Sequence, residues 1–214
     1  LDFVDFNRAL KAAKSAVDGG ADWIEAGTPL IKSEGLQVIR KLRDNFPKVT
    51  IVADMKTMDA GRIEMEAAAK AGANVAMVMG VAPDSTIKEC IIAGHNYGMQ
   101  IGIDLLGVND YLKRAKELEH WDADFIGLHT AIDDQMRGVS GFGELNTLCS
   151  NVKLPVSVAG GINSETVADV IKAGAKIIVV GGAICKSKDV KKATEELKFA
   201  IKNGSKTRNR ISFE

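Results

Sequence analysis

VTIVADMKTMD, residues 49–59, is an apolar run that ends in charged side chains. The run predicts a buried strand. Side chains two residues apart on a strand point to the same face, so we expect Asp54 and Lys56 to emerge together. Asp59 follows in the loop before the next helix. Opposed charges at the end of a buried strand are costly unless they are paired or used. Taken alone, the stretch fits a salt bridge that caps a strand as well as it fits a catalytic device.

Short apolar runs alternate with amphipathic helical stretches along the chain. The runs are apolar throughout, as expected for parallel strands covered by helices. They lie at residues 23–26, 49–55, 75–79, 100–104, 125–128, 155–158 and 177–180, with a stub at Leu1. The helical stretches lie at residues 7–17, 35–45, 63–71, 85–96, 111–119, 165–173 and 190–202. Eight strands alternating with helices in 214 residues predict an α/β fold, a (β/α)8 TIM barrel. An open doubly wound sheet is the alternative.

A repeated Gly-Ala pair supports this alternation. Gly20, Gly72 and Gly174 each stand between a helical stretch and the next strand, where glycine commonly ends a helix. Their nearly regular spacing indicates repeated strand–helix units. Because no linker, low-complexity tract or charge block interrupts the chain, we expect one barrel domain over residues 1–214. Its first strand is truncated at the N-terminus.

The composition excludes several classes of partner. Lysine plus arginine and aspartate plus glutamate each number 28, so no basic field is present to attract nucleic acid or an anionic membrane. No apolar stretch approaches the length of a membrane span, and no signal-peptide pattern opens the chain. The three cysteines are scattered without metal-type spacing, as small buried hydrophobes are in a reducing compartment. We therefore expect a cytoplasmic protein.

Polar side chains stand where the predicted strands end, which is where barrel enzymes carry their active sites. They are Asp2, Glu25, Asp54, Lys56, Asp59, Asp104 and His129. One such residue is easily structural, whereas this convergence indicates a functional site. His129 has a pKa range suited to proton transfer, with a structural histidine as the alternative.

Two glycine pairs end the last two predicted strands. Gly160-Gly161 and Gly181-Gly182 stand at the positions where barrels often bind a phosphate through backbone N–H groups and a short following helix. Glycine lets the backbone approach an anion closely and adopt a positive φ. The pairs could also serve only to turn the chain, but their position favours a phosphate site.

Glu25 and Asp54 are carboxylates on adjacent strand ends. Oxygen ligands of this kind suit magnesium, or manganese, rather than zinc. Two carboxylates make an incomplete cage, so water and substrate oxygens would complete it. A pairing of Glu25 with Lys56 would need no metal, and the residues alone leave both interpretations open.

Three segments together resemble the orotidine-monophosphate decarboxylase suprafamily. They are Asp2, IEAGTPL at residues 24–30 and DMKTMD at residues 54–59. The Glu-x-Gly-Thr-Pro-Leu pattern is similar to the magnesium-dependent branch of that family, which holds hexulose-phosphate synthases and keto-gulonate-phosphate decarboxylases. The resemblance spans essentially the whole chain.

Departures from the other members point to the synthases. Ala60 follows the motif where orotidine decarboxylases have isoleucine and then proline. Ile132 stands three residues after His129, where keto-gulonate decarboxylases carry an arginine. Gly182 replaces another arginine that is common in decarboxylases. The HTAIDDQ segment, residues 129–135, resembles the synthase form.

The resemblance implies an aldolase that joins formaldehyde and D-ribulose 5-phosphate reversibly through a magnesium-stabilised 1,2-enediolate. It implies that the glycine pairs hold the phosphate, that Glu25 and Asp54 hold the metal, and that His129 removes the C1 proton. Lys56, kept cationic by Asp2, Asp54 and Asp59, would add positive charge. Its raised pKa argues against a Schiff base.

The resemblance also implies a homodimer with shared active sites, in which Asp59 reaches into the partner's site. The alternatives are a 3-keto-L-gulonate-6-phosphate decarboxylase and, in another class, a non-catalytic phosphate-binding barrel. The basic segment at residues 206–210 is a solvated end, a dimer contact or a junction to another domain.

Overall fold

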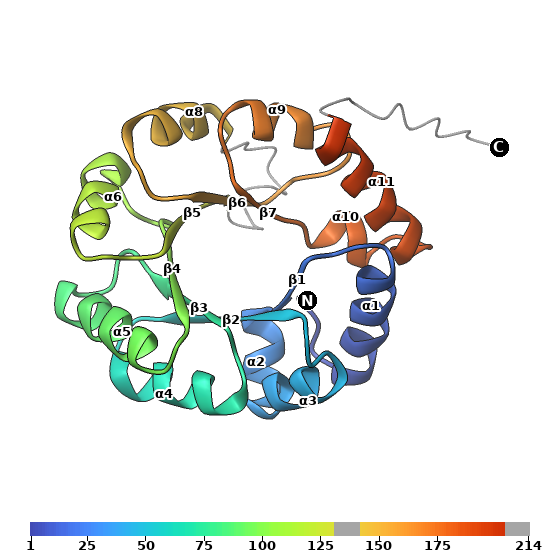
Figure 1. Cartoon of the computed structure of the whole chain (residues 1–214), viewed down its shortest axis with the longest axis horizontal. Helices are drawn as coiled ribbons and strands as arrows, with labels where there is room; N and C mark the ends of the chain where they lie inside the picture. Colours follow the sequence, from blue (N-terminus) through green and yellow to red (C-terminus); the bar gives the residue numbers. More distant parts are fainter. Residues whose placement is uncertain (131–141, 204–214) are drawn as a thin grey trace.

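The structure, a computed structural model, describes residues 1–130 and 142–203 of the chain. Seven parallel strands form one sheet whose order follows the sequence. They are β1 (Trp23–Ala26), β2 (Thr50–Thr57), β3 (Val75–Met79), β4 (Gln100–Asp104), β5 (Phe125–His129), β6 (Val156–Ala159) and β7 (Ile177–Val179). The sheet curves around a central axis with helices along its outer side (Figure 1).

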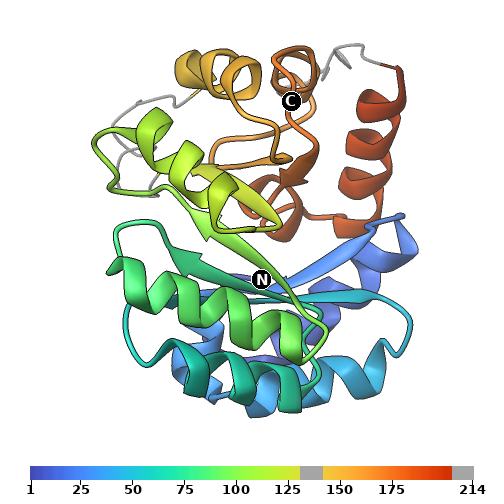
Figure 2. The ribbon, with the colours of Figure 1, turned by 60° about the vertical axis from the view of Figure 1, so that its left-hand side comes forward.

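Helices connect the strands. They are α1 (Phe6–Asp18), α2 (Thr28–Glu34), α3 (Gln37–Asn45), α4 (Gly61–Ala71), α5 (Asp84–Asn96), α6 (Tyr111–His120), α8 (Phe142–Asn151), α9 (Val167–Lys172), α10 (Gly182–Cys185) and α11 (Val190–Asn203). Figure 2 shows from another side that these helices stay outside the sheet. The basic segment at residues 206–210 lies outside the described residues.

The predicted alternation of strands and helices is confirmed. All seven interior apolar runs form strands, and their sequential order excludes the doubly wound alternative, in which the strand order reverses. Gly20, Gly72 and Gly174 follow helices with φ values of 95°, 103° and 108°. This left-handed conformation explains the repeated glycine. The sequence did not predict α2, because its seven residues are too few for a helical period to stand out.

The expected first strand is not a strand in the structure. Residues 1–5 have no strand assignment. The amino group of Leu1 nevertheless donates to the carbonyl oxygen of Glu25 at 2.7 Å, and the N–H of Gly27 donates to the carbonyl oxygen of Leu1 at 3.3 Å. The start of the chain therefore lies beside the end of β1.

An apolar cluster fills the inner side of the curved sheet. This interior cluster consists of Val52, Val75, Met77 and Phe125. The Phe125 ring packs on Gly102, where an added Cβ would lie 2.3 Å from a ring carbon. Side chains two residues apart on a strand share a face, so the cluster lies on the face that Asp54, Asp104 and His129 occupy nearer the carboxyl ends. It forms an apolar floor under these polar groups.

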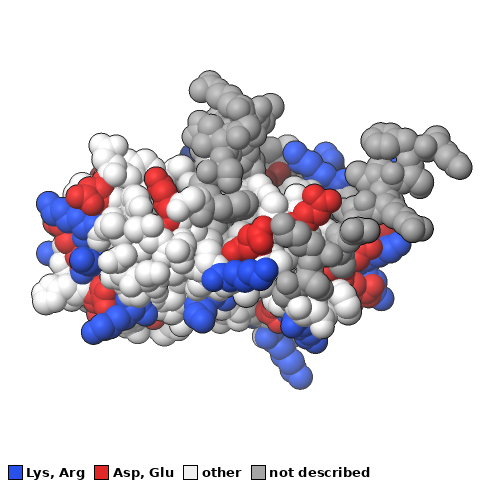
Figure 3. Space-filling model, turned by 90° about the horizontal axis from the view of Figure 1, so that it is seen from above, with Lys and Arg blue, Asp and Glu red and all other residues white. Residues whose placement is uncertain are grey.

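The surface and the thiols agree with the composition. On the side seen in Figure 3, basic and acidic side chains of the described residues are interspersed rather than gathered by sign. Cys90 is buried, Cys149 and Cys185 are half-buried, and all three are free thiols. No helix within the described ranges is long and apolar enough to cross a membrane. The cytoplasmic location stays a prediction.

Arg43, in the last turn of α3, braces the amino ends of β2 and β3. Its guanidinium donates to the carbonyl oxygens of Val49 and Gly72, each at 3.0 Å. It also donates to the side chain of Asn74, whose oxygen accepts from the backbone N–H of Ile51 at 2.9 Å. One side chain thus serves several backbone groups at the end of the sheet opposite Lys56.

We predict that Arg43→Met lowers the free energy of unfolding by about 2–3 kcal/mol, because partly buried carbonyl groups lose a charged donor. Chemical denaturation measures the change. Arg40→Met, at an exposed position of the same helix, is the matched control and should change the value by less than about 0.5 kcal/mol. Equal losses in both variants would contradict the role of Arg43.

Candidate active site

Four charged side chains form a connected network at the carboxyl ends of β2, β4 and β5. The Lys56 ammonium lies 3.0 Å from Oδ2 of Asp54 and 3.2 Å from Oδ2 of Asp104. The same Asp104 oxygen lies 3.0 Å from Nδ1 of His129. Asp54 and Asp104 are only 8% and 4% exposed, so they would be costly as isolated charges. The network satisfies them together.

Lys56 reaches this position through an irregularity in β2. Ala53 pairs with Ala76 and Thr57 pairs with Val78, so four residues of β2 oppose two of β3. Within this bulge Lys56 has a φ of 47°, in the left-handed region. The prediction that Asp54 and Lys56 emerge together is confirmed by their ion pair. A bulge, rather than a regular strand, brings them together.

Lys56 is held as an ammonium ion. Burial lowers its pKa, but the charges of Asp54 and Asp104 and the hydrogen bonds to them outweigh this effect and raise the pKa above its ordinary value. The high pKa agrees with the sequence argument against a Schiff-base lysine. Of the carboxylates expected near Lys56, Asp54 pairs with it, and Asp104 adds an ion pair that the sequence did not predict. In the described part of the chain Lys56 forms ion pairs with Asp54 and Asp104, and none with Asp2 or Asp59.

Asp104 joins Lys56 to His129. Burial alone would raise the pKa of Asp104, but the hydrogen bond from His129, the charges of His129 and Lys56 and the Leu106 N–H hold it below its ordinary value. An ionised carboxylate only accepts hydrogen bonds, so Nδ1 of His129 carries a proton. Sequence reasoning noted Asp104 at a strand end without assigning it a role, because its partners lie on other strands.

Asp104 also changes the pKa of His129. The hydrogen bond to Asp104 raises the pKa of His129, and the negative charge of Asp104 adds to this effect against the opposing effect of burial. With Nδ1 occupied by Asp104, the neutral ring offers Nε2 as its basic nitrogen. The site therefore combines a fixed positive charge on Lys56 with a group that can accept a proton.

Glu25 lies near the end of β1, and the carboxylate of Asp54 is close enough to affect its charge. Burial, together with the negative charge of Asp54, raises the pKa of Glu25 to about 7. Two carboxylates that repel each other and offer only oxygen atoms fit a divalent cation such as magnesium. The alternative pairing is not seen, because Glu25 and Lys56 form no ion pair within the described ranges.

The protein would supply only part of such a metal shell. Among residues 1–130 and 142–203, no three carboxylate, imidazole or thiol groups gather into a metal site. Water and substrate oxygens would have to complete the shell of a metal held by Glu25 and Asp54. Thr28 orients one of the two ligands: its Oγ1 lies 2.8 Å from Oδ2 and 2.8 Å from the backbone oxygen of Asp54. The sequence motif contained Thr28, but nothing in it indicated this contact.

Asp2 lies between the ends of β1 and β7. A Cβ added at Gly27 would lie 2.1 Å from Oδ1 of Asp2, and one added at Gly181 would lie 3.6 Å from Oδ2. The charge of Asp2 contributes to the raised pKa of Glu25. Asp2 is thus close to the candidate metal ligands, although it makes no ion pair with Lys56 in the described structure.

Asp59 occupies the loop between β2 and α4 and is exposed. Its Oδ1 accepts from the backbone N–H of Ala60 at 2.7 Å. Two apolar neighbours are also exposed, Met58 by 46% and Ile63 by 70%. Asp59 therefore follows the same strand end as Lys56 but takes no part in the ion-pair network of the described residues.

The two glycine pairs differ in conformation. Gly160 and Gly161 follow β6 with φ values of 100° and 69°, as predicted for glycine at this position. Gly181 has a φ of −97° and is the N-cap of α10, and Gly182 is the first residue of that helix. The second pair therefore does not use positive φ and instead begins the predicted short helix.

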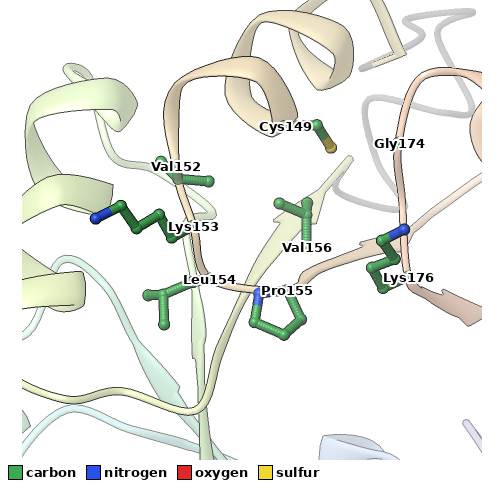
Figure 4. A pocket seen from close by; sticks show the side chains of 8 residues that line it. All are labelled: Cys149, Val152, Lys153, Leu154, Pro155, Val156, Gly174 and Lys176. Atoms are coloured by element: carbon green, nitrogen blue, oxygen red, sulfur yellow. The ribbon is translucent and has the colours of Figure 1, made fainter.

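A pocket of about 170 Å³ lies at the other end of the sheet, before β6 (Figure 4). Its lining includes Cys149, Pro155 and Gly174, with Lys153 and Lys176 on opposite sides of it. Its charged groups do not converge, and it contains none of the predicted site residues. We therefore assign the functional site to the network around Lys56.

Comparisons with known proteins show which family the chain resembles over nearly its whole length. The model of the "Orotidine 5'-phosphate decarboxylase / HUMPS family" matches residues 1–197. A curated 3-hexulose-6-phosphate synthase from Methylomonas aminofaciens is 43% identical over 198 residues, 92% of this chain and 94% of that protein. A crystal structure of 3-hexulose-6-phosphate synthase is 39% identical, with a TM-score of 0.90 over 94% of this chain and 97% of that chain. A crystal structure of 3-keto-L-gulonate-6-phosphate decarboxylase from Vibrio cholerae is 25% identical, with a TM-score of 0.83 over 96% of each chain.

We predict that Asp104→Asn lowers the pKa of His129, because the variant removes the negative charge that stabilises the imidazolium. An NMR titration of the imidazole resonances measures the change. The chemical shifts of the exposed His120 ring are the control and should be the same in both proteins. An unchanged or raised pKa of His129 would contradict the assigned network.

Proposed function

Because the chain belongs to the orotidine 5′-phosphate decarboxylase / HUMPS family, we propose that it catalyses the 3-hexulose-6-phosphate synthase reaction. This lyase reaction joins formaldehyde and D-ribulose 5-phosphate reversibly. The observation that carries the mechanism is the Lys56 ammonium held between Asp54 and Asp104, with His129 bound to the same Asp104. Enediolate chemistry needs a base and a fixed positive charge, and this network contains both.

His129 performs the proton transfer. With Nδ1 donating to Asp104, Nε2 takes the proton from C1 of ribulose 5-phosphate and leaves an enediolate. The Lys56 ammonium stabilises the negative charge that develops on the enediolate oxygen. C1 then attacks the carbonyl carbon of formaldehyde and forms the new carbon–carbon bond. The formaldehyde oxygen takes up the proton that His129 holds, so no net proton is gained or lost.

Glu25 and Asp54 are the residues that hold magnesium, or manganese, in this proposal. When bound, the ion supplies positive charge beside the substrate carbonyl and so makes the neighbouring C–H more acidic. Glu25 must be ionised to act as a ligand. Because its pKa is raised to about 7, metal affinity should fall as the pH drops below neutral. Thr28 keeps the Asp54 carboxylate in one orientation through its hydrogen bond.

The substrate phosphate is assigned to the two glycine pairs. Gly160 and Gly161 at the end of β6, and Gly181 and Gly182 at the start of α10, offer backbone N–H groups without side chains that would keep an anion away. The two pairs follow neighbouring strands, β6 and β7, at the end of the sheet that carries the network, and this common position supports the assignment.

We assign residues 1–3 to the place beside β1 that the first strand of an eight-stranded barrel would occupy. Two backbone hydrogen bonds between Leu1 and the end of β1 support this assignment. The position of Asp2 between Gly27 and Gly181 supports it further, because these glycines follow the first and last strands of the sheet.

The active form is proposed to be a homodimer in which Asp59 enters the partner's site. Asp59 is exposed and makes no ion pair with Lys56 in the described part of its own subunit. The exposed side chains of Met58 and Ile63 beside it form apolar surface of the kind that a partner covers.

The decisive measurement is exchange of the C1 proton of ribulose 5-phosphate with deuterium, followed by NMR without formaldehyde. We predict exchange with magnesium, its loss with EDTA, and its recovery when magnesium is restored. Lys56→Ala should slow exchange by about 1000-fold or more, because the charge that stabilises the enediolate is removed. Addition of formaldehyde to the wild-type protein should then yield the hexulose 6-phosphate.

Absence of metal-dependent exchange in the wild-type protein would overturn the synthase assignment. Full turnover by Lys56→Ala would exclude the role of the ammonium. Release of carbon dioxide from 3-keto-L-gulonate 6-phosphate without condensation of formaldehyde would identify the decarboxylase instead. Binding of inorganic phosphate by Lys56→Ala is the control that its fold is intact.

A mixing experiment tests the shared site. Lys56→Ala and Asp59→Ala are each expected to be inactive, but after dissociation and mixing they should recover about a quarter of wild-type activity. The reason is that about half of the dimers are mixed and each mixed dimer holds one intact site. A mixture of Lys56→Ala with His129→Ala is the matched control and should recover nothing, because both residues serve the same subunit's site. Equal results for the two mixtures would contradict a shared site.

A further inference from the structure

We propose that Thr57 and Glu64 are a positioning pair for the reaction. The hydrogen bond between them holds the adjoining residues Lys56 and Asp59 in their productive positions. The inference rests on the proposed function of these two residues. Neither Thr57 nor Glu64 belongs to the ion-pair network, and neither needs to touch substrate.

Thr57 is a buried polar residue with one side-chain partner. It is the last residue of β2 and only 1% exposed. Its Oγ1 donates to Oε2 of Glu64 in the first turn of α4. A buried hydroxyl that lost this acceptor would be left unsatisfied. The bond therefore ties the end of the strand to the start of the next helix, across the loop of residues 58–60.

The backbone on both sides of Thr57 is unusual. Lys56 has a φ of 47° and Ala60 a φ of 53°, both in the left-handed region that non-glycine residues rarely adopt. Such conformations persist only where surrounding contacts hold them. Ala60 is the N-cap of α4, and no side chain caps this helix. Thr57 directly follows Lys56, and the Thr57–Glu64 bond spans the loop that contains both Ala60 and Asp59.

Glu64 lies in the first turn of α4, where this helix packs closely on α5. A Cβ at Gly61 would lie 2.7 Å from Sγ of Cys90 and 2.7 Å from the carbonyl oxygen of Thr86, so the two helices meet without space between them. On the surface, Arg62 and Glu89 join the same helices at 2.8 Å. Motion of the loop is therefore limited at α4 by packing and at β2 by the hydrogen bond from Thr57.

If the pair positions catalytic groups, its loss should change the kinetic constants in a different way from the loss of a contact that only stabilises the fold. Loss of the bond frees Lys56 and Asp59 from their productive geometry while the glycine pairs, Glu25 and Asp54 stay in place. Misplacement of catalytic groups lowers kcat, whereas uniform ground-state binding determines KM. The effect should therefore appear in kcat rather than in KM for ribulose 5-phosphate.

The test compares disruptive and conservative variants at both residues. Thr57→Val and Glu64→Ala remove the bond and should lower kcat by about tenfold or more, with KM changed less than about threefold. Thr57→Ser keeps the donor and Glu64→Gln keeps the acceptor of this hydrogen bond. Both conservative variants should therefore have a kcat within about threefold of wild type. Glu66→Ala is the matched control, because Glu66 lies on the same helix but pairs with Lys70 on the surface.

A second readout does not depend on the reaction. Hydrogen–deuterium exchange of peptides that contain residues 56–60 should be faster in Thr57→Val and Glu64→Ala than in the wild-type protein, and unchanged in Glu66→Ala. If Thr57→Val does not fold, Glu64→Ala breaks the same bond from the other side.

The inference is overturned if the disruptive variants keep kcat within about twofold of wild type, or if kcat falls no more than the folded fraction does. It is also overturned if amide exchange in residues 56–60 does not change. A wild-type protein without synthase activity would defeat the proposed function instead. In that case exchange in residues 56–60 would still report whether the bond holds the loop.

Discussion

One ammonium group shared by two buried carboxylates holds the candidate site together. Lys56 contributes a fixed cation to this network, and Asp54 and Asp104 would each be costly as isolated buried anions. Their mutual dependence settles the charge states: Lys56 is cationic, Asp104 is ionised, and Nδ1 of His129 is therefore protonated. The site holds its positive charge before substrate arrives, which is the arrangement that stabilises a developing anion most effectively.

The two ends of the strands have different tasks. Toward the amino ends, the interior cluster fills the inside of the sheet, and Arg43 braces the edge through backbone carbonyl groups. Toward the carboxyl ends, the same inward-facing strand positions carry Asp54, Asp104 and His129. The apolar cluster borders these groups on one side, while the side chains of Lys56 and His129 stay partly exposed on the other. On β2 and β5, the residues of the interior cluster and the residues of the site are therefore only two to four positions apart.

Much of this arrangement was predictable from the chain. Uninterrupted apolar runs predicted the seven strands, because parallel strands that are buried on both faces are apolar at nearly every position. The prediction of a hexulose-phosphate synthase is confirmed by the relatives, and the motif around Lys56 had led to it. What could not be predicted depends on neighbours that are distant in sequence. The hydrogen bond from Lys56 to Asp104 spans 48 residues, and the bulge that contains Lys56 has no local signature such as glycine. Asp2 lies beside Gly27 and Gly181 and forms no ion pair with Lys56 in the described structure, and the expected role of Asp59 in the partner's site stays a prediction.

The bulge in β2 also determines where the extra length of that strand lies. Because four residues of β2 oppose two of β3 and pairing resumes at Thr57, the extra length is absorbed before the strand ends. The register of β2 against β3 shifts by two residues between Ala53 and Thr57, and because this shift is even the two residues still share a face. The additional residues of β2 therefore lie between Ala53 and Thr57, inside the strand rather than at its end. The extra length of β2 is therefore confined to the three residues that include Asp54 and Lys56, and regular pairing flanks them on one side and a single pair on the other.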